Sequence, residues 1–310
     1  MSDLPLRSPP GVGAKVLLVV LSLVWGLSWP AVRIALDEVA PLTLRALSYG
    51  VGTLFLFSLL RLRGRRASLP FGRVYLHVTV SALLNIFGFG VITTFAQLNA
   101  FTSRVVIVSY SMPVWASLMA WLILGERLNP ASILGLVLCV FGLTVLVYPV
   151  MQSGAPLGLL LAFVAALCWA AGTIYVKWAR IPGDGIVVTA WQLAIAFVAA
   201  AVAAAAFEGI PHLWPLSLPV VLALAFHGPI GTGIAYLLWF TIVGRLPAAT
   251  ASLGSLLTPV VGIGSTILLV GERPTLADAI GFMLIFAAAA AVLVERASQQ
   301  PSITPPGREG

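Results

Sequence analysis

Long apolar runs alternate with short polar connections along almost the whole chain. None of these runs shows the two-residue alternation of a half-buried strand or of a membrane barrel. The runs lie at 15–36, 41–60, 73–96, 103–124, 130–149, 156–178, 186–207, 217–242, 247–270 and 275–295. About 20 apolar residues suffice to cross a bilayer as a helix, and a lipid-exposed span must satisfy its own backbone hydrogen bonds. The pattern therefore predicts an all-α polytopic membrane protein with ten transmembrane helices.

Composition supports the lipid bilayer as the surrounding phase. The chain is 60% hydrophobic and 9% charged, with a mean hydropathy of +1.06. Soluble domains carry about 25% charged residues. The net charge of +7 does not indicate nucleic acid, because the basic residues cluster between apolar runs, most densely between Arg61 and Arg73.

The distribution of Lys and Arg predicts the orientation. Ten spans place both termini on one side, which we expect to be the cytoplasm. That side then carries Arg7, Lys15, Arg61, Arg63, Arg65, Arg66, Arg73, Arg127, Lys177, Arg180, Arg245, Arg296 and Arg308, against Arg33, Arg45, Arg104 and Arg273 outside. This bias follows the positive-inside rule. Residues 1–14 and the Pro-rich residues 296–310 are then cytoplasmic tails, the second one disordered. We expect no removable signal peptide.

The two halves of the chain repeat each other. The stretch LILGERLNP at 122–130 returns as LLVGERPTL at 268–276, and Pro113 returns as Pro259 at the same shift of 146. The repeats are expected at 15–149 and 156–295, with five spans each. An odd number of spans makes the second repeat enter the membrane from the opposite face. Inverted repeats of this kind are typical of secondary transporters that work by alternating access.

The repeated motifs resemble those of the EamA family of the drug/metabolite transporter (DMT) superfamily over residues 15–295. The resemblance rests on Trp25-Gly26, on SYSMPVWASLMAWLILGERL at 109–128 and on its second copy; Ala170 replaces the second Trp-Gly glycine. It implies a permease of a bacterial inner membrane that exports amino acids or related small metabolites and drugs. Uptake of a small nutrient or vitamin such as riboflavin is the alternative.

Polar and aromatic residues inside the spans are candidates for a transport pathway, because polar groups rarely face lipid. His77, Ser81 and Asn85 share one helical face, and His227 matches Ser81 at the repeat shift. The candidate substrate-binding residues are Trp25, Asn85, Tyr110, Trp169, Gln192, His227 and Tyr236. The alternative is that they only pack and bond between helices.

Three further features have two interpretations each. Pro113 and Pro259 are hinges or static kinks. The triplets with Glu126, Arg127, Glu272 and Arg273 are tight corners or gating salt bridges. In the corner interpretation the glycine ends one helix and the glutamate caps the next. Arg45 snorkels to the outer surface or meets an anionic group of a substrate.

Other classes of protein lack support in the sequence. All ten carboxylates lie in tails, connections or helix ends, so a coupling proton would have to use His227 or His77. If transport is not coupled to protons, we expect the protein to be a facilitator or exchanger. Three scattered histidines and two isolated cysteines predict no metal site, cofactor or enzyme, and no filter-like loop indicates a channel. We expect a monomer or weak homodimer that carries a small-molecule substrate.

Overall fold

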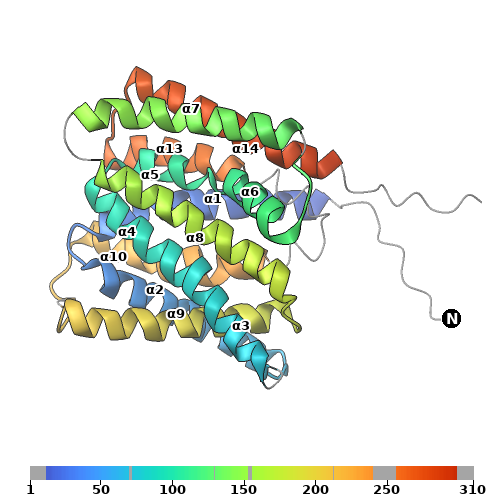
Figure 1. Ribbon diagram of the computed structural model, residues 1–310. Coiled ribbons are helices and arrows are strands. Elements are labelled where there is room, and N and C mark those ends of the chain that lie inside the picture. The colour runs from blue at the N-terminus through green and yellow to red at the C-terminus, as the bar shows by residue number, and fades with distance from the viewer. Residues whose placement is uncertain are drawn as a thin grey trace, which may run out of the picture.

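The computed structural model describes residues 12–69, 72–128, 130–152, 156–211, 213–239 and 256–298, and within these ranges the chain is helical without strands (Figure 1). The helices are α1 (Val12–Ala35), α2 (Pro41–Leu62), α3 (Arg73–Ser81), η1 (Ala82–Gly88), α4 (Phe89–Asn99), α5 (Thr102–Ser109), α6 (Met112–Leu124), α7 (Pro130–Gln152), α8 (Leu157–Ala179), α9 (Gly185–Phe207), α10 (Leu218–Phe226), η2 (His227–Ile234), α13 (Leu257–Val270) and α14 (Leu276–Ser298). Here η marks a π-helical segment.

Among the described residues, eight helical spans are long and apolar enough to cross a membrane. They are Val16–Ala35, Pro41–Leu62, Arg73–Asn99, Thr102–Leu124, Pro130–Pro149, Leu157–Ala179, Gly185–Phe207 and Leu218–Trp239, and two shorter apolar helices follow at Leu257–Val270 and Leu276–Val292. The all-α polytopic prediction is confirmed. The connection between the eighth and ninth predicted spans, and the start of the ninth, lie outside the described residues.

The two repeats run through the bundle in opposite directions. One end of the bundle, here the Arg65 end, holds the described connecting residues 63–69, 125–128 and 180–184, where Arg65 pairs with Asp184. The other end, here the Glu272 end, holds the described connecting residues 36–40, 100–101, 208–211, 213–217 and 271–275. Helix α1 runs from the Arg65 end to the Glu272 end, and α8, which opens the second repeat, runs back.

Counterpart helices of the two repeats have counterpart packing partners. Helix α1 packs on α13 and on α10–η2, and its counterpart α8 packs on α5–α6 and on α3–η1–α4. The two most extensive contacts join counterpart helices to each other, α2 to α9 and α7 to α14, and α2 also packs on η2 as α9 packs on η1. Swapping the repeats therefore leaves the packing scheme unchanged, as a twofold axis in the membrane plane requires.

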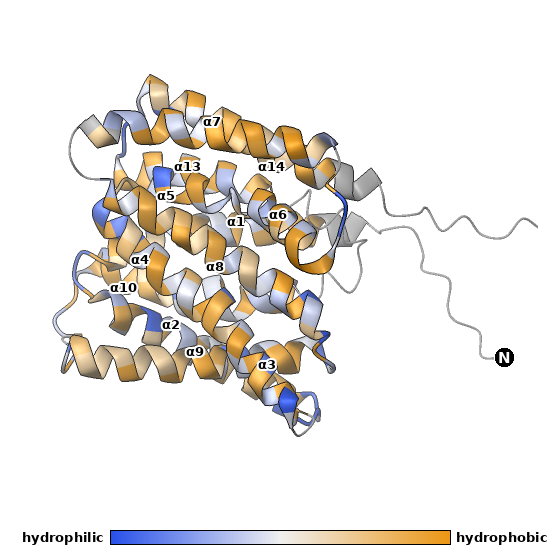
Figure 2. Ribbon diagram, viewed as in Figure 1, coloured by the Kyte–Doolittle hydropathy of each residue, from blue (hydrophilic) through white to orange (hydrophobic). Residues whose placement is uncertain are grey.

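Helices α7 and α14 form a peripheral pair at one side of the bundle (Figure 1). Small residues bring them close: a Cβ on Gly281 would lie 2.4 Å from the Leu146 Cγ, and one on Gly142 would lie 2.9 Å from Ile285. Close backbone approach is the usual basis of helix association in lipid. Val137 and Phe141 on the outer face of α7 are 60% exposed, and apolar residues predominate along the helices (Figure 2).

The spans nearest the centre are irregular, and the irregularities recur in both repeats. The third span of each repeat contains a π-helical segment, η1 in the first and η2 in the second. The expected continuous helix at 103–124 is interrupted at Tyr110 and Ser111, directly before α6, whose second residue is Pro113. π-Helical turns are frequent at functional sites, and these segments surround the central cavity.

Candidate functional site

A cavity of about 140 Å³ lies between the repeats near the middle of the bundle. It is lined by residues of α1, α2, η1, α4, α8 and η2, by the break between α5 and α6, and by Tyr236 just beyond η2. Both π-helical segments contribute, η1 through Asn85 and Ile86, η2 through His227 and Thr232. The site is therefore built where the third spans of the two repeats depart from regular α-helix.

Most of the residues predicted as cavity-lining meet in this cavity. Those that line it are Trp25, Asn85, Tyr110, Trp169, His227 and Tyr236. Gln192 is not brought to it. Its amide nitrogen instead donates to the Ser81 hydroxyl at 2.8 Å, so Gln192 bonds α9 to α3. His77 also lies away from the lining, with Nδ1 2.8 Å from the Tyr175 hydroxyl oxygen.

Arg45 is the central charged group of the cavity, and the snorkelling interpretation is wrong. The residue is only 8% exposed. Its Nε donates to the Thr94 hydroxyl at 2.5 Å, and Nη1 lies 3.4 Å from the His227 Nε2. Because a guanidinium has only donors, this His227 nitrogen is the acceptor and the ring proton belongs on Nδ1.

Two threonines of helix α4 present hydrogen-bond acceptors to this guanidinium. The hydroxyls of Thr93 and Thr94 donate to the carbonyl oxygen of Gly90, at 3.0 and 2.8 Å. Each hydroxyl oxygen thus presents lone pairs outward, and Thr93 accepts a long bond of 3.5 Å from Arg45 Nη2. Thr93 and Thr94 are adjacent hydroxyl residues in the span that follows the span of Arg45. They are the feature of the sequence that could have indicated a polar partner for Arg45.

Gly90 is required by the close approach of α2. A Cβ at this position would lie 1.8 Å from the Tyr49 hydroxyl oxygen and 3.6 Å from the Arg45 guanidinium carbon. The Tyr49 hydroxyl donates to the Ile86 carbonyl in η1 at 2.8 Å. Tyr49 therefore anchors α2 to the π-helical segment and holds Arg45 against α4.

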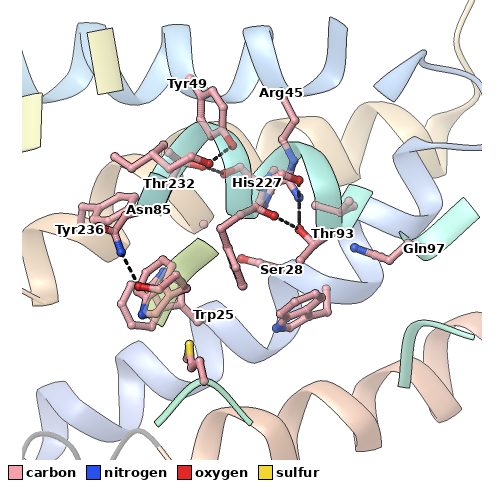
Figure 3. A pocket seen from close by; sticks show the side chains of 18 of the residues that line it. Trp25, Ser28, Arg45, Tyr49, Asn85, Thr93, Gln97, His227, Thr232 and Tyr236 are labelled. Carbon is pink, nitrogen blue, oxygen red and sulfur yellow. Dashed lines mark hydrogen bonds between the residues drawn. The ribbon is translucent and has the colours of Figure 1, made fainter. Parts of the chain in front are cut away.

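The opposite part of the cavity is aromatic. The rings of Trp25 and Tyr236 meet edge to face, with centroids 6.2 Å apart, and those of Phe89 and Trp169 are 4.9 Å apart. The Asn85 amide donates to the Trp169 carbonyl at 3.1 Å, which joins η1 to α8. Figure 3 shows Arg45, Thr93 and His227 gathered on one side, with Trp25, Asn85 and Tyr236 on the other.

A second recess, of about 480 Å³, opens at the Glu272 end. It is lined by Arg33, Arg104 and Glu272 among others, and Gln97 belongs to both this recess and the central cavity. Gln97 is 2% exposed. Its amide nitrogen has no hydrogen-bond partner within the described part of the chain.

Two carboxylates, the buried Glu272 and the half-buried Glu208, hold helix N-termini at the Glu272 end. Glu272 accepts from the backbone N–H groups of Thr102 and Ser103, at 2.5 and 2.9 Å, and from the Ser103 hydroxyl at 2.6 Å. Glu208 accepts in the same way from the N–H groups of Leu42 and Thr43. Both carboxylates accept hydrogen bonds from backbone N–H groups that have no partner within their helix. Each also places a negative charge next to the positive end of that helix dipole.

The glycines of both Gly-Glu-Arg triplets end a helix, but the expected cap partner of Glu272 is wrong. Gly125 and Gly271 end their helices with φ of 67° and 76°, as predicted. Glu272 caps α5 in the other repeat, however, whereas the following helix α14 is capped through Thr275 and Asp278. A sequence pattern cannot report this partner, because the helix it caps is 170 residues away.

The first triplet is arranged differently. Glu126 pairs with Lys177 at the surface of the Arg65 end, with side chains 41% and 59% exposed. Arg127 and Arg273 are both exposed. At the opposite end, hydrogen bonds from Ser217 to Glu38 lower the pKa of that carboxyl.

Antiparallel repeats of membrane-spanning helices around a central cavity with a buried cation are typical of a multi-pass membrane transporter. The chain belongs to the EamA-like transporter family, whose model matches residues 13–148 and 156–294. It is a DMT-type transporter of a small-molecule substrate in a lipid bilayer.

Two curated relatives and one solved structure extend over nearly the whole chain. The "Uncharacterized transporter YoaV" of Bacillus subtilis is 27% identical, covering 87% of this chain and 94% of that protein. A "Probable amino-acid metabolite efflux pump" of Escherichia coli is 27% identical, covering 88% and 91%. A crystal structure with 25% identity covers 95% of this chain and all of that chain, with a TM-score of 0.65.

Because Glu272 is a buried helix cap and Glu126 an exposed ion-pair partner, we expect the same substitution to destabilise the protein more at Glu272 than at Glu126. Glu272→Gln replaces one acceptor oxygen by an NH₂ that faces backbone donors. We therefore expect a loss of about 1–3 kcal/mol of stability, seen as a lower melting temperature of the detergent-solubilised protein. Glu126→Gln is the matched control and should change it little, because exposed ion pairs contribute about 0–1 kcal/mol. Equal shifts for the two variants would contradict the capping role of Glu272.

Proposed function

We propose that this transporter exports amino acids or related small metabolites and drugs across a bacterial inner membrane by alternating access. The observation that carries the proposal is the central cavity between two antiparallel repeats, lined by both π-helical segments. The relative named as an amino-acid metabolite efflux pump supports export. A small cavity with an aromatic side fits metabolites of the size of amino acids.

The proposed orientation places the Arg65 end and both termini in the cytoplasm. Residues 15–149 and 156–295 are then the two repeats, and 1–14 and 296–310 are cytoplasmic tails. The concentration of Lys and Arg at the Arg65 end supports this orientation. The second recess and the helix caps of Glu208 and Glu272 then face the outside.

Alternating access needs elements with two arrangements. Pro113 is the second residue of α6, beside the break at Tyr110, and Pro259 lies in the first turn of α13. We assign both prolines as hinges, and the pair Glu126–Lys177 together with the Glu272 cap as contacts that open and close the two ends. If protons are coupled to transport, His227 is their carrier, because it lines the cavity and His77 does not.

The direction of transport predicts a phenotype in cells. A strain that overexpresses the protein should tolerate toxic amino-acid analogues and drugs better than an empty-vector control, and a deletion strain should tolerate them less. Minimal inhibitory concentrations over a panel of such compounds measure this. Sensitisation by overexpression would contradict export and favour uptake of a nutrient or vitamin. Counterflow in proteoliposomes with any compound that responds would separate a carrier from a channel.

The orientation predicts where reporters appear. Tags inserted after Arg127 and after Arg273 should lie on opposite sides of the membrane, cytoplasmic and external respectively. Alkaline phosphatase and green fluorescent protein fusions measure this, with a tag after Arg66 as the cytoplasmic control. Tags after Arg127 and Arg273 on the same side would contradict the inverted repeats.

The hinge assignment predicts slower transport without loss of protein. Pro113→Ala and Pro259→Ala remove the fixed φ angle at the start of α6 and of α13, so each should slow counterflow roughly tenfold, about 1.4 kcal/mol on the barrier. Pro149→Ala in the peripheral helix α7 is the matched control and should have little effect. Loss of folded protein in proportion to activity would support static kinks instead.

A further inference from the structure

We propose that the central cavity selects small organic anions, with the substrate carboxylate bound to Arg45 and its apolar part against the aromatic side. This inference rests on the proposed transport function and narrows its substrates, from amino acids and related metabolites to those metabolites that carry a net negative charge. It starts from a charge that has no counter-ion in the described part of the chain.

The seven carboxylates whose side chains the structure describes are all engaged elsewhere. Asp37 pairs with Arg33, Asp184 with Arg65, Asp278 with Arg104 and Glu126 with Lys177, while Glu38, Glu208 and Glu272 bond to Ser217 and to the N-termini of α2 and α5. These groups lie at the two ends of the bundle, and none of them lines the central cavity. Arg45 is left with hydroxyls and an imidazole, which are neutral partners.

A buried cation of this kind favours a bound anion. Placing an ionised side chain within a membrane protein is costly, and such residues usually mark a substrate pathway. A carboxylate would neutralise the guanidinium and take up its remaining donors in the bidentate geometry that Arg favours. The complex as a whole would then be neutral.

Two neighbouring donors are also unused. The Gln97 Nε2 and the His227 Nδ1 have no hydrogen-bond partner in the described structure, although both side chains are more than nine-tenths buried. The bond from Arg45 to the His227 Nε2 places the ring proton on Nδ1, so both unused groups are donors. Buried donors are rarely left without a partner. A ligand with several acceptor atoms, such as a carboxylate, would supply partners for them.

The aromatic side determines the rest of the ligand. Trp25, Phe89 and Trp169 offer ring faces and edges to an apolar or aromatic group. The same side holds no carboxylate for an ammonium group, since none of the described cavity-lining residues is acidic. A zwitterionic amino acid would leave the site with a net positive charge, whereas a simple aromatic carboxylate would leave none. Charge therefore favours the net anion.

The experiment compares matched probes on the full-length protein in nanodiscs. Phenylacetate, its neutral isostere phenylacetamide and zwitterionic phenylalanine are titrated by calorimetry. We expect phenylacetate to bind at least about tenfold more tightly than phenylacetamide, because a hydrogen bond between charged groups is worth that factor or more. We expect phenylalanine to bind more weakly than phenylacetate.

Substitutions test whether Arg45 in the cavity causes the preference for phenylacetate over phenylacetamide. Arg45→Gln should reduce the ratio of the two affinities to about one, and Arg45→Lys should keep part of it. Arg65→Gln removes an exposed guanidinium at the Arg65 end and should keep the wild-type ratio. Gln97→Glu leaves Arg45 in place but supplies an internal carboxylate one turn from Thr93, so it should weaken phenylacetate binding without weakening phenylacetamide binding. Gel filtration verifies that each variant is folded.

The outcomes separate this inference from the proposed function. Equal binding of phenylacetate and phenylacetamide, or a preference that survives in folded Arg45→Gln, would overturn the anion site. Absence of binding by all three probes would overturn it too. If Arg45→Gln does not fold, the wild-type ratio and Gln97→Glu decide. In each case, resistance of the overexpressing strain still tests export independently.

Discussion

The hydrocarbon interior offers neither hydrogen-bond partners nor counter-charges, and the main features of this molecule follow from that constraint. Backbone groups are satisfied within helices. The carboxylates whose side chains the structure describes lie at helix ends, where Glu208 and Glu272 meet free N–H groups and the others meet cations or a loop N–H. The constraint that makes the chain helical also places its acidic groups at the two ends of the bundle. Arg45 is the exception, and the exception lies in the cavity.

The inverted repeats give the molecule a symmetric frame with unequal contents. Packing partners exchange between repeats, and each repeat has a π-helical segment in its third span. Within this frame Asn85 in η1 is bonded to the backbone of α8, while His227 in η2 faces Arg45. The two Gly-Glu-Arg triplets likewise share a backbone turn but differ in burial. Symmetry thus supplies the scaffold, and the asymmetric side chains give the cavity one cationic side and one aromatic side.

Sequence reasoning and structure agree where the signal is local. Ten apolar runs, the repeat shift and the positive-φ glycines are properties of short segments, so they could be predicted without coordinates. Six of the seven predicted cavity residues also meet in the cavity, because polar and aromatic groups inside spans have few other places to go. Gln192, the Glu272 cap and the burial of Arg45 could not be predicted in the same way. Each depends on which helix lies opposite, at a separation of 49 residues or more.

By itself, the sequence determined that this chain spans a membrane as helices and does so in two related halves, because hydrophobic length and internal repetition are written along the chain. Only the tertiary structure decided which polar groups meet. The face that a helix turns inward is fixed by close contacts such as Gly90 against Tyr49, which bring Arg45 to the threonines of α4. From the sequence alone, Arg45 lies about one turn inside a span and is interpreted as a snorkelling arginine. In the folded protein α4 and η2 pack around it, and it is a buried charge.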